Sequence, residues 1–141
     1  MDIQTFRFSI STQGKTDISD ITHEVQKIIS DSGYLEGNAL VFAPGSTAGI
    51  TTIEYEPGLL KDYPDFFEKV IPSDITYHHD ATWHDGNGHS HVRASLQGAS
   101  FLVPFNAGRL LLGTWQQIIF VDFDNRSRRR EVIVQLTGKK E

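Results

Sequence analysis

The segment Tyr77–His91 is the part of this chain whose residue types are best suited to chemistry. It holds two carboxylates, Asp80 and Asp85, and five of the six histidines in the sequence, namely His78, His79, His84, His89 and His91. Neutral imidazoles beside carboxylates bind transition metals and transfer protons near neutral pH. Because the segment is polar and contains Gly86 and Gly88, another part of the fold must hold it in place. We therefore expect a functional site here; the alternative is a surface loop that happens to be rich in histidine.

Spacing limits which of these histidines can act together. On a strand His89 and His91 would point to the same face, but on a helix they would diverge by about 200°. The segment 91–98 has helix-forming residues and ends in glycine, which favours a short helix or turn and leaves only one of the pair on the site. His78 and His79 are adjacent, and adjacent residues rarely both bind one metal ion. Geometry does not decide which of the two would be the ligand.

A second candidate is the turn Pro44-Gly45-Ser46-Thr47-Ala48-Gly49, which follows an apolar strand. Small residues and hydroxyls leave backbone N–H groups free to donate hydrogen bonds to a phosphate or carboxylate. The segment lacks the lysine of a Walker A loop, and a plain tight turn explains it equally well. Glu54 ends the following strand, where it can be a general base, a ligand or a surface charge.

Two further segments have polar groups that a ligand could use. Gly113-Thr114-Trp115-Gln116-Gln117 places amides beside a glycine that we expect in a strand, where glycine often marks the close approach of a backbone or ligand. Trp115 itself is expected in the core. The basic run Arg126–Arg130 can grip an anion, but beside Asp122 and Asp124 we expect it to pair across a hairpin or with a neighbouring subunit.

Composition excludes several classes of protein. The chain has 141 residues and no long polar tract, so we expect a single domain over residues 1–141. It has no cysteine, which excludes thiolate catalysis, cysteine zinc ribbons and disulfide scaffolds and fits a reducing, cytoplasmic location. The net charge of −5 argues against nucleic-acid binding. We expect no signal peptide at the N-terminus and no membrane span.

Hydrophobic periodicity predicts the elements that must position these groups. Phe6, Phe8 and Ile10 alternate with polar residues, as in a half-buried strand. One helix is expected from Asp17 to the C-terminal cap Gly33, with Asp17 or Asp20 as N-cap, and another from near Pro64 to before Pro72. Apolar runs bounded by turn residues predict further short strands at 38–43, 48–55, 100–104, 109–112, 116–122 and 130–137. The expected fold class is α+β, mainly β: an antiparallel β-sandwich of about eight strands with two helices packed on it.

Four segments of the chain together resemble the YjbQ-like family, also called secondary thiamine-phosphate synthases. They are Gly45-Ser46-Thr47-Ala48 with Glu54 downstream; Tyr77-His78-His79-Asp80; Asn87-Gly88-His89-Ser90-His91; and Gly98 to Gly108-Arg109-Leu110 with Leu112-Gly113-Thr114-Trp115-Gln116. The resemblance spans nearly the whole chain. It implies a β-rich sandwich that assembles as a homo-oligomer, commonly a trimer. It also implies a histidine-bound divalent metal, zinc or alternatively magnesium, and weak thiamine-phosphate synthesis.

The resemblance also assigns individual residues. It places His79, Asp80 and His91 in the site and makes Glu54 the acid at the strand end. His89 is absent in some relatives. Some relatives have a histidine where this chain has Gly45. The turn 44–49 therefore lacks one imidazole in this chain.

From these observations we expect a metal-assisted enzyme that acts on a small phosphorylated metabolite. The expected metal ligands are His79 and His91 with His89 as the third, although His78 is an alternative. Glu54 and Asp80 are the expected catalytic groups, and the expected substrate contacts are Ser46, Thr47, Asn87, Thr114 and Gln116. The expected partners are this substrate and further copies of the chain in a homotrimer, without nucleic acid or membrane. A non-enzymatic, small-anion-binding homo-oligomeric module is the alternative.

Overall fold

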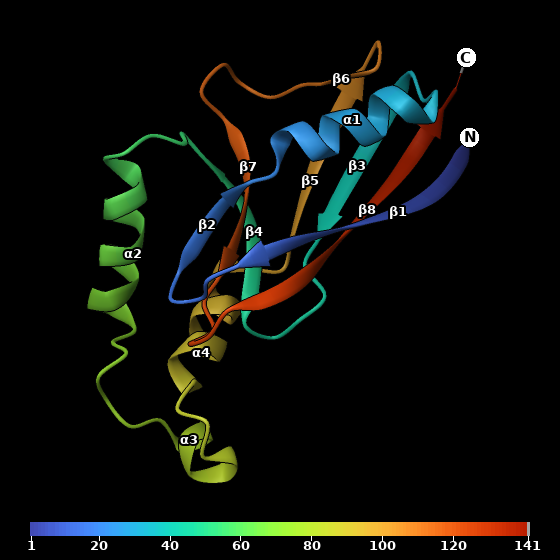
Figure 1. The fold of residues 1–141 in the computed structure, drawn as a ribbon. Coiled ribbons are helices and arrows are strands. Elements are labelled where there is room, and N and C mark those ends of the chain that lie inside the picture. Colours follow the sequence, from blue (N-terminus) through green and yellow to red (C-terminus); the bar gives the residue numbers. More distant parts are fainter. Residues whose placement is uncertain (141) are drawn as a thin grey trace.

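The computed structural model describes residues 1–140, which form two antiparallel sheets and four helices within that range (Figure 1). The elements follow in the order β1 (Asp2–Thr12), β2 (Asp17–Asp20), α1 (Thr22–Ser32), β3 (Glu36–Phe42), β4 (Ala48–Ile53), α2 (Leu59–Val70), α3 (His78–Trp83), α4 (Gly88–Gln97), β5 (Ser100–Asn106), β6 (Arg109–Leu110), β7 (Gln117–Asp122) and β8 (Arg128–Lys139). The larger sheet has the strand order β1-β8-β3-β5-β6, and the smaller has β2-β7-β4. The predicted mainly-β α+β fold with two antiparallel sheets is therefore confirmed, with α3 added to the two expected helices and with α4 where a short helix or turn was expected.

Strand β7 explains how the layers are held together. Its residues Ile118 and Phe120 pack in a core shared by both sheets and α1, whereas Ile119 and Val121 pack in a second core with α2 and α4. Side chains alternate between the two faces of a strand, so a strand buried on both faces must be apolar at every position. β7 is thus the central strand of the smaller sheet, with the larger sheet on one side and helices on the other.

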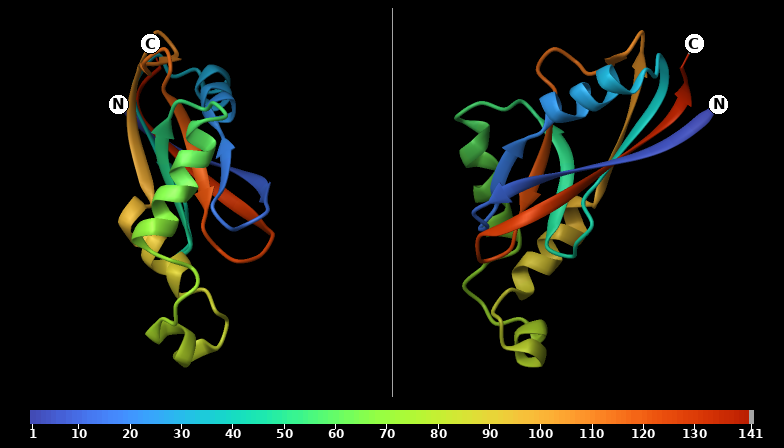
Figure 2. Two further views of the ribbon diagram at one scale, coloured as in Figure 1. Left: turned by 90° about the vertical axis from the view of Figure 1, so that its left-hand side faces the viewer. Right: turned by 45° about the vertical axis from the view of Figure 1, so that its right-hand side comes forward.

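Helix α3 lies apart from these layers. In both views of Figure 2 it projects at one end of the molecule, beyond the sheets. It has no buried residue, and it begins with a capping box in which the Asp80 carboxylate accepts the backbone N–H of Tyr77. Its position therefore depends on polar contacts and on the neighbouring helix α4. Within residues 1–140 no helix is both long and apolar enough to cross a membrane.

The expected helix from Asp17 is wrong at its start. Residues 17–20 form strand β2, which pairs with β7 and buries Ile18, so the apolar residue that fitted a helical period belongs to a sheet. Helix α1 begins at Thr22, whose backbone N–H donates to the Asp20 carboxylate. The predicted end is confirmed, because Gly33 adopts the left-handed conformation with φ of 84°.

Two other boundaries and the place of one side chain differ from those expected. Helix α2 begins at Leu59 rather than near Pro64, because the Glu56 carboxylate accepts the N–H groups of Gly58 and Leu59 and caps an earlier turn. Residues 113–116 form a turn rather than a strand, closed by the Gln116 side chain, which accepts the N–H of Gly113. Trp115 is 70% exposed in this turn, so its expected place in the core is wrong.

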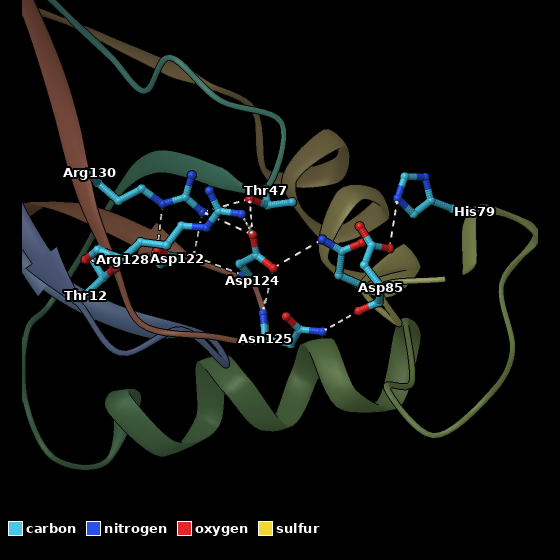
Figure 3. A network of polar contacts seen from close by, with 10 residues as sticks. Thr12, Thr47, His79, Asp85, Asp122, Asp124, Asn125, Arg128 and Arg130 are labelled. Carbon is cyan, nitrogen blue, oxygen red and sulfur yellow. Dashed lines mark hydrogen bonds and ion pairs between the residues drawn. The ribbon is translucent and has the colours of Figure 1, made fainter. Parts of the chain in front are cut away.

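A buried charge network joins the two sheets at one end (Figure 3). The guanidinium of Arg130, on β8, donates to both carboxylate oxygens of Asp122, on β7, at 2.7 and 2.8 Å. Thr12, at the end of β1, donates its hydroxyl to the same carboxylate at 2.5 Å. Because β7 belongs to the smaller sheet and β1 and β8 to the larger, these bonds tie the sheets to each other.

A second ion pair continues the network toward the helices. Arg128 contacts Asp124 at 2.7 Å, and Arg130 also donates to the hydroxyl of Thr47 at 2.7 Å. That hydroxyl in turn donates to Asp124 at 3.1 Å. Arg128 and Arg130 thus pair within the chain with the acids across the β7–β8 turn, although the strands that flank this turn lie in different sheets.

Burial acts to raise the pKa values of Asp122 and Asp124, because it penalises the charged form. For Asp122, the hydrogen bonds from Arg130 and Thr12 more than offset this effect. For Asp124, the backbone N–H of Asn125, the amide of Asn87 and the charge of Arg128 do the same. Both pKa values therefore lie below the ordinary range, and both groups are ionised near neutral pH.

We predict that Arg130→Met lowers the free energy of unfolding by about 3–5 kcal/mol, because it leaves buried carboxylates without their cation. The measurement is urea unfolding at one protein concentration. Arg7→Met is the matched control, since Arg7 forms an exposed ion pair with Glu131 in the same sheet, and it should cost about 1 kcal/mol or less. Equal losses for the two variants would contradict the role given to the network.

The lowered pKa of Asp122 determines how the free energy of unfolding should change in acid. A carboxyl whose pKa is lowered by folding contributes stability above its unfolded pKa of about 3.9, and this contribution is lost as the pH falls through the folded value. We expect Asp122→Asn to lose less unfolding free energy than the wild type between about pH 5 and pH 3. The control is Asp31→Asn, which removes only an exposed pair with Lys27. A wild-type acid dependence in Asp122→Asn would refute this expectation.

Candidate functional site

Helices α3 and α4 bring two of the predicted histidines together. The ring centroids of His79, on α3, and His91, on α4, are 4.2 Å apart, with an angle of 45° between the ring planes. The two residues are 12 positions apart in the sequence, so it is the placement of α3 beside α4 that makes the pair. Imidazoles from two separate elements therefore meet at one point.

Asp85 adds a carboxylate to this pair. One of its oxygens lies 3.6 Å from Nε2 of His79. That nitrogen is fully buried and makes no hydrogen bond within residues 1–140. Two imidazoles, one of them with a buried nitrogen that has no partner, and a nearby carboxylate are the ligand types that a divalent metal such as zinc prefers.

The buried charge network reaches this site through Asn125, which the sequence pattern had suggested only as a turn residue (Figure 3). The backbone N–H of Asn125 donates to Asp124 at 2.8 Å, and its side-chain amide donates to the backbone carbonyl of Asp85 at 2.9 Å. Asp85 in turn approaches His79. A chain of polar contacts thus runs from the core to the exposed helix α3.

Burial lowers the pKa of His91, and the neighbouring His79 lowers it further, while Asp124 and Asp85 act in the opposite direction. The net effect is a pKa below the ordinary value. His91 is therefore mostly neutral near pH 7, the state in which an imidazole nitrogen can bind a metal or accept a proton.

Asp80, an expected catalytic group, is engaged in holding the two helices. Its carboxylate accepts the backbone N–H groups of Tyr77 at 3.1 Å and of Gly88 at 2.8 Å. These two bonds lower its pKa. Gly88 is required at this contact, since a Cβ there would lie 2.4 Å from the Cβ of Tyr77. Asp80 thus fixes where α3 and α4 begin.

His89 does not join the pair. It lies on α4 beside Tyr77, with a centroid separation of 6.3 Å, and it lines a different cavity from His91. The helix favoured for this segment is present, and it directs His89 and His91 to different cavities. Within residues 1–140 no group of three or more histidine, aspartate or glutamate side chains converges as a ready-made metal site.

Of the two hydroxyl residues in the turn 44–49, only one lies beside His91. Ser46 and His91 line one cavity of about 260 Å³. Thr47 is buried, and its hydroxyl is already bound in the charge network. Asn87 is also buried, and its side-chain amide donates to Asp124 at 3.2 Å. Ser46 is thus the hydroxyl of this turn that remains open to a ligand.

The other predicted residues lie at the far end of β4. Ala48, at the start of this strand, pairs with Asp122, whereas Ile53 pairs with Gln117. Five residue steps along the strand separate these ends by about 17 Å. Glu54 follows Ile53 and is exposed, and the Gln116 side chain donates to Thr52 at 3.1 Å. Within one chain, Glu54, Thr114 and Gln116 are therefore far from the His79–His91 pair.

Comparison with known proteins identifies relatives along nearly the whole chain. The family model described as UPF0047 protein YjbQ-like matches residues 6–139. A UPF0047 protein of Archaeoglobus fulgidus is 37% identical over 128 residues, which cover 91% of this chain and 98% of that protein. The UPF0047 protein YugU of Bacillus subtilis is 37% identical over 131 residues, covering 92% and 96%.

Solved structures agree with this result. A YbjQ-like protein of unknown function from Sulfolobus solfataricus superposes with a TM-score of 0.88 at 29% identity, covering 98% of this chain and all of that one. An uncharacterized conserved protein of the yjbq/upf0047 family from Clostridium acetobutylicum has a TM-score of 0.86 at 38% identity, covering 94% and 99%. The match over residues 6–139 and these relatives show that the chain belongs to the YjbQ-like UPF0047 family.

Proposed function

We propose that this protein is a metal-assisted enzyme that acts on a small phosphorylated metabolite in the cytoplasm. His79 and His91 would bind the metal, with zinc as the first candidate. The observation that supports this most directly is the buried Nε2 of His79, which lacks a hydrogen bond within residues 1–140 and faces a carboxylate beside a second imidazole. A buried nitrogen without a partner is costly unless a ligand satisfies it.

Asp85 takes the third position in this proposal in place of His89. Its side chain is about half exposed and lies on a turn next to Gly86, which has a φ of 66°. It can therefore rotate toward the pair, whereas His89 would have to cross its own helix. Asn125 holds the backbone of Asp85, so that only the side chain needs to move. When bound, the metal would polarise a phosphoryl oxygen or lower the pKa of a bound water.

The cavity beside His91 is the proposed place for the substrate. It measures about 260 Å³ and is lined mainly by small residues, namely Gly45, Ser46, Ala48, His91, Ala94, Ser95, Gly98 and Ala99. Such a lining leaves room for a phosphoryl group close to the imidazole. Arg130 lies close to Gly45 of this lining, since its Nη1 would lie 3.2 Å from a Cβ at Gly45. The Ser46 hydroxyl and this positive charge would orient the phosphate.

Self-association belongs to the same proposal, with a homotrimer as the expected state. Three large apolar side chains, Leu102, Leu111 and Trp115, are 60%, 56% and 70% exposed. Exposed apolar side chains of this size are common at subunit interfaces. An interface would also give a role to Glu54, Thr114 and Gln116, which are distant from the histidine pair of their own chain.

We predict that the purified protein binds about one zinc ion per chain and that His79→Ala and His91→Ala each weaken zinc binding by about tenfold or more. The measurements are metal content after dialysis and calorimetric titration, followed by turnover of a panel of small phosphate monoesters. His78→Ala is the matched control, because His78 is exposed and precedes His79 directly. If His79→Ala leaves zinc binding unchanged, the proposed metal site is wrong. Phosphate-ester binding without any product would instead support a non-enzymatic anion-binding module.

Thiamine-phosphate synthesis remains a narrower prediction, supported by the family resemblance. We expect the chain to allow slow growth, without added thiamine, of a bacterial strain that lacks its dedicated thiamine-phosphate synthase. His79→Ala should abolish this growth and His78→Ala should retain it. If the well-expressed wild-type protein fails to restore growth, this activity is excluded while the metal site stays open to the preceding test.

A further inference from the structure

A second cavity lies on the side of α4 that carries His89. It measures about 480 Å³ and is lined by Lys15, Thr16, Pro64, Asp65, Glu68, Ser73, His89, Arg93 and Asn125. These residues come from the loop before β2, from α2 and the segment that follows it, from α4, and from the turn after β7. This volume is in the range of small-molecule sites. The proposed metal and substrate positions do not use this cavity.

The floor of the cavity is an ion pair and is therefore electrically neutral. Arg93 is buried and donates to the carbonyl of Ile71, to the hydroxyl of Thr16 and to the carboxylate of Glu68. The same carboxylate also accepts the N–H and hydroxyl of Ser73. Arg93 and Glu68 therefore satisfy each other and leave little capacity for a ligand.

One wall is a strained loop. Gly14, Lys15 and Thr16 are consecutive residues in the left-handed region, with φ values of 79°, 60° and 62°. For a residue with a side chain this conformation costs about 1–2 kcal/mol, and for threonine it is especially unusual. The loop is held because Lys15 donates its N–H to the carbonyl of Asp124 and Thr16 is bonded to Arg93. Strain maintained in this way is typical of ligand-binding loops.

The groups that remain open have opposite charges. Within residues 1–140 the side chains of Lys15, Asp65 and His89 make no hydrogen bond or ion pair, although all three line this cavity. His89 adds an imidazole to these open groups. The open charged side chains are the ammonium of Lys15 and the carboxylate of Asp65, which form no ion pair with each other.

We propose that this cavity is a second binding site, for a small zwitterion that has an ammonium group and a phosphate or carboxylate group. The ligand's anionic group would meet Lys15 and the imidazole of His89, and its ammonium would meet Asp65. The neutral Arg93–Glu68 floor would favour a ligand that carries both an ammonium and an anionic group over a simple anion. This proposal is independent of the metal site, since it uses none of the residues proposed to bind the metal.

The test is NMR titration of metal-free, isotope-labelled protein with O-phosphoethanolamine and β-alanine, which differ in their anionic group. Inorganic phosphate and ethanolamine test each half of the ligand alone. We expect at least one zwitterion to bind about tenfold more tightly than either half, with shifts at Lys15, Asp65 and His89. Lys15→Gln and Asp65→Asn should each weaken that binding by about tenfold.

The matched controls are Lys61→Gln and Asp62→Asn, which remove the same charges from exposed positions of α2 that do not line the cavity. They should leave the affinity unchanged, as should His79→Ala. Phosphate binding as tightly as both zwitterions would overturn the proposal. So would shifts confined to the Ser46–His91 cavity, equal losses in the control variants, or no binding by either zwitterion at millimolar concentrations.

Discussion

The contact between Arg130 and Asp122 is the constraint on which the rest of the structure depends. It joins β8 to β7, and therefore the larger sheet to the smaller, at the end where Thr12 and Thr47 also converge. Charges in such a place are costly to bury unless every donor and acceptor is used. The network satisfies most of its donors and acceptors through hydroxyls and backbone N–H groups, although Nε of Arg128 and Oδ1 of Asn87 have no partner within residues 1–140. Its geometry fixes the β7–β8 turn, and this turn is the support for the histidine pair.

Helix α3 shows why that support matters. A helix of six residues with no buried side chain has little stability of its own. It is held by the Asp80 carboxylate, which bonds to both helix starts, and by the Asp85 turn, which Asn125 ties to Asp124. The imidazole pair is thus positioned by polar contacts rather than by packing. Such an arrangement lets a polar site sit at the edge of a domain whose apolar core lies elsewhere.

Much of the fold could be predicted because the relevant signals are local. The continuous apolar run of β7 and the left-handed glycine after α1 depend on neighbouring residues in the sequence. The start of α1 could not be predicted in this way, because Ile18 fits both a helical face and a short strand, and only its pairing with β7 decides between them. The exposed Trp115 was missed for a similar reason. Its hydrophobicity indicated core, but the Gln116 side chain closes a turn that faces outward.

For the site, sequence reasoning succeeded where helix geometry sufficed and failed where a long-range contact was needed. The helical period separates His89 from His91, so one His-Ser-His segment gives its two imidazoles to two different cavities. The role of Asn125 had no local signal, since an asparagine in a turn is common. Asn125 nonetheless lines the cavity of His89 and holds the backbone of Asp85 beside His79. A ligand that moved this side chain would therefore alter the surroundings of the histidine pair through a single hydrogen bond.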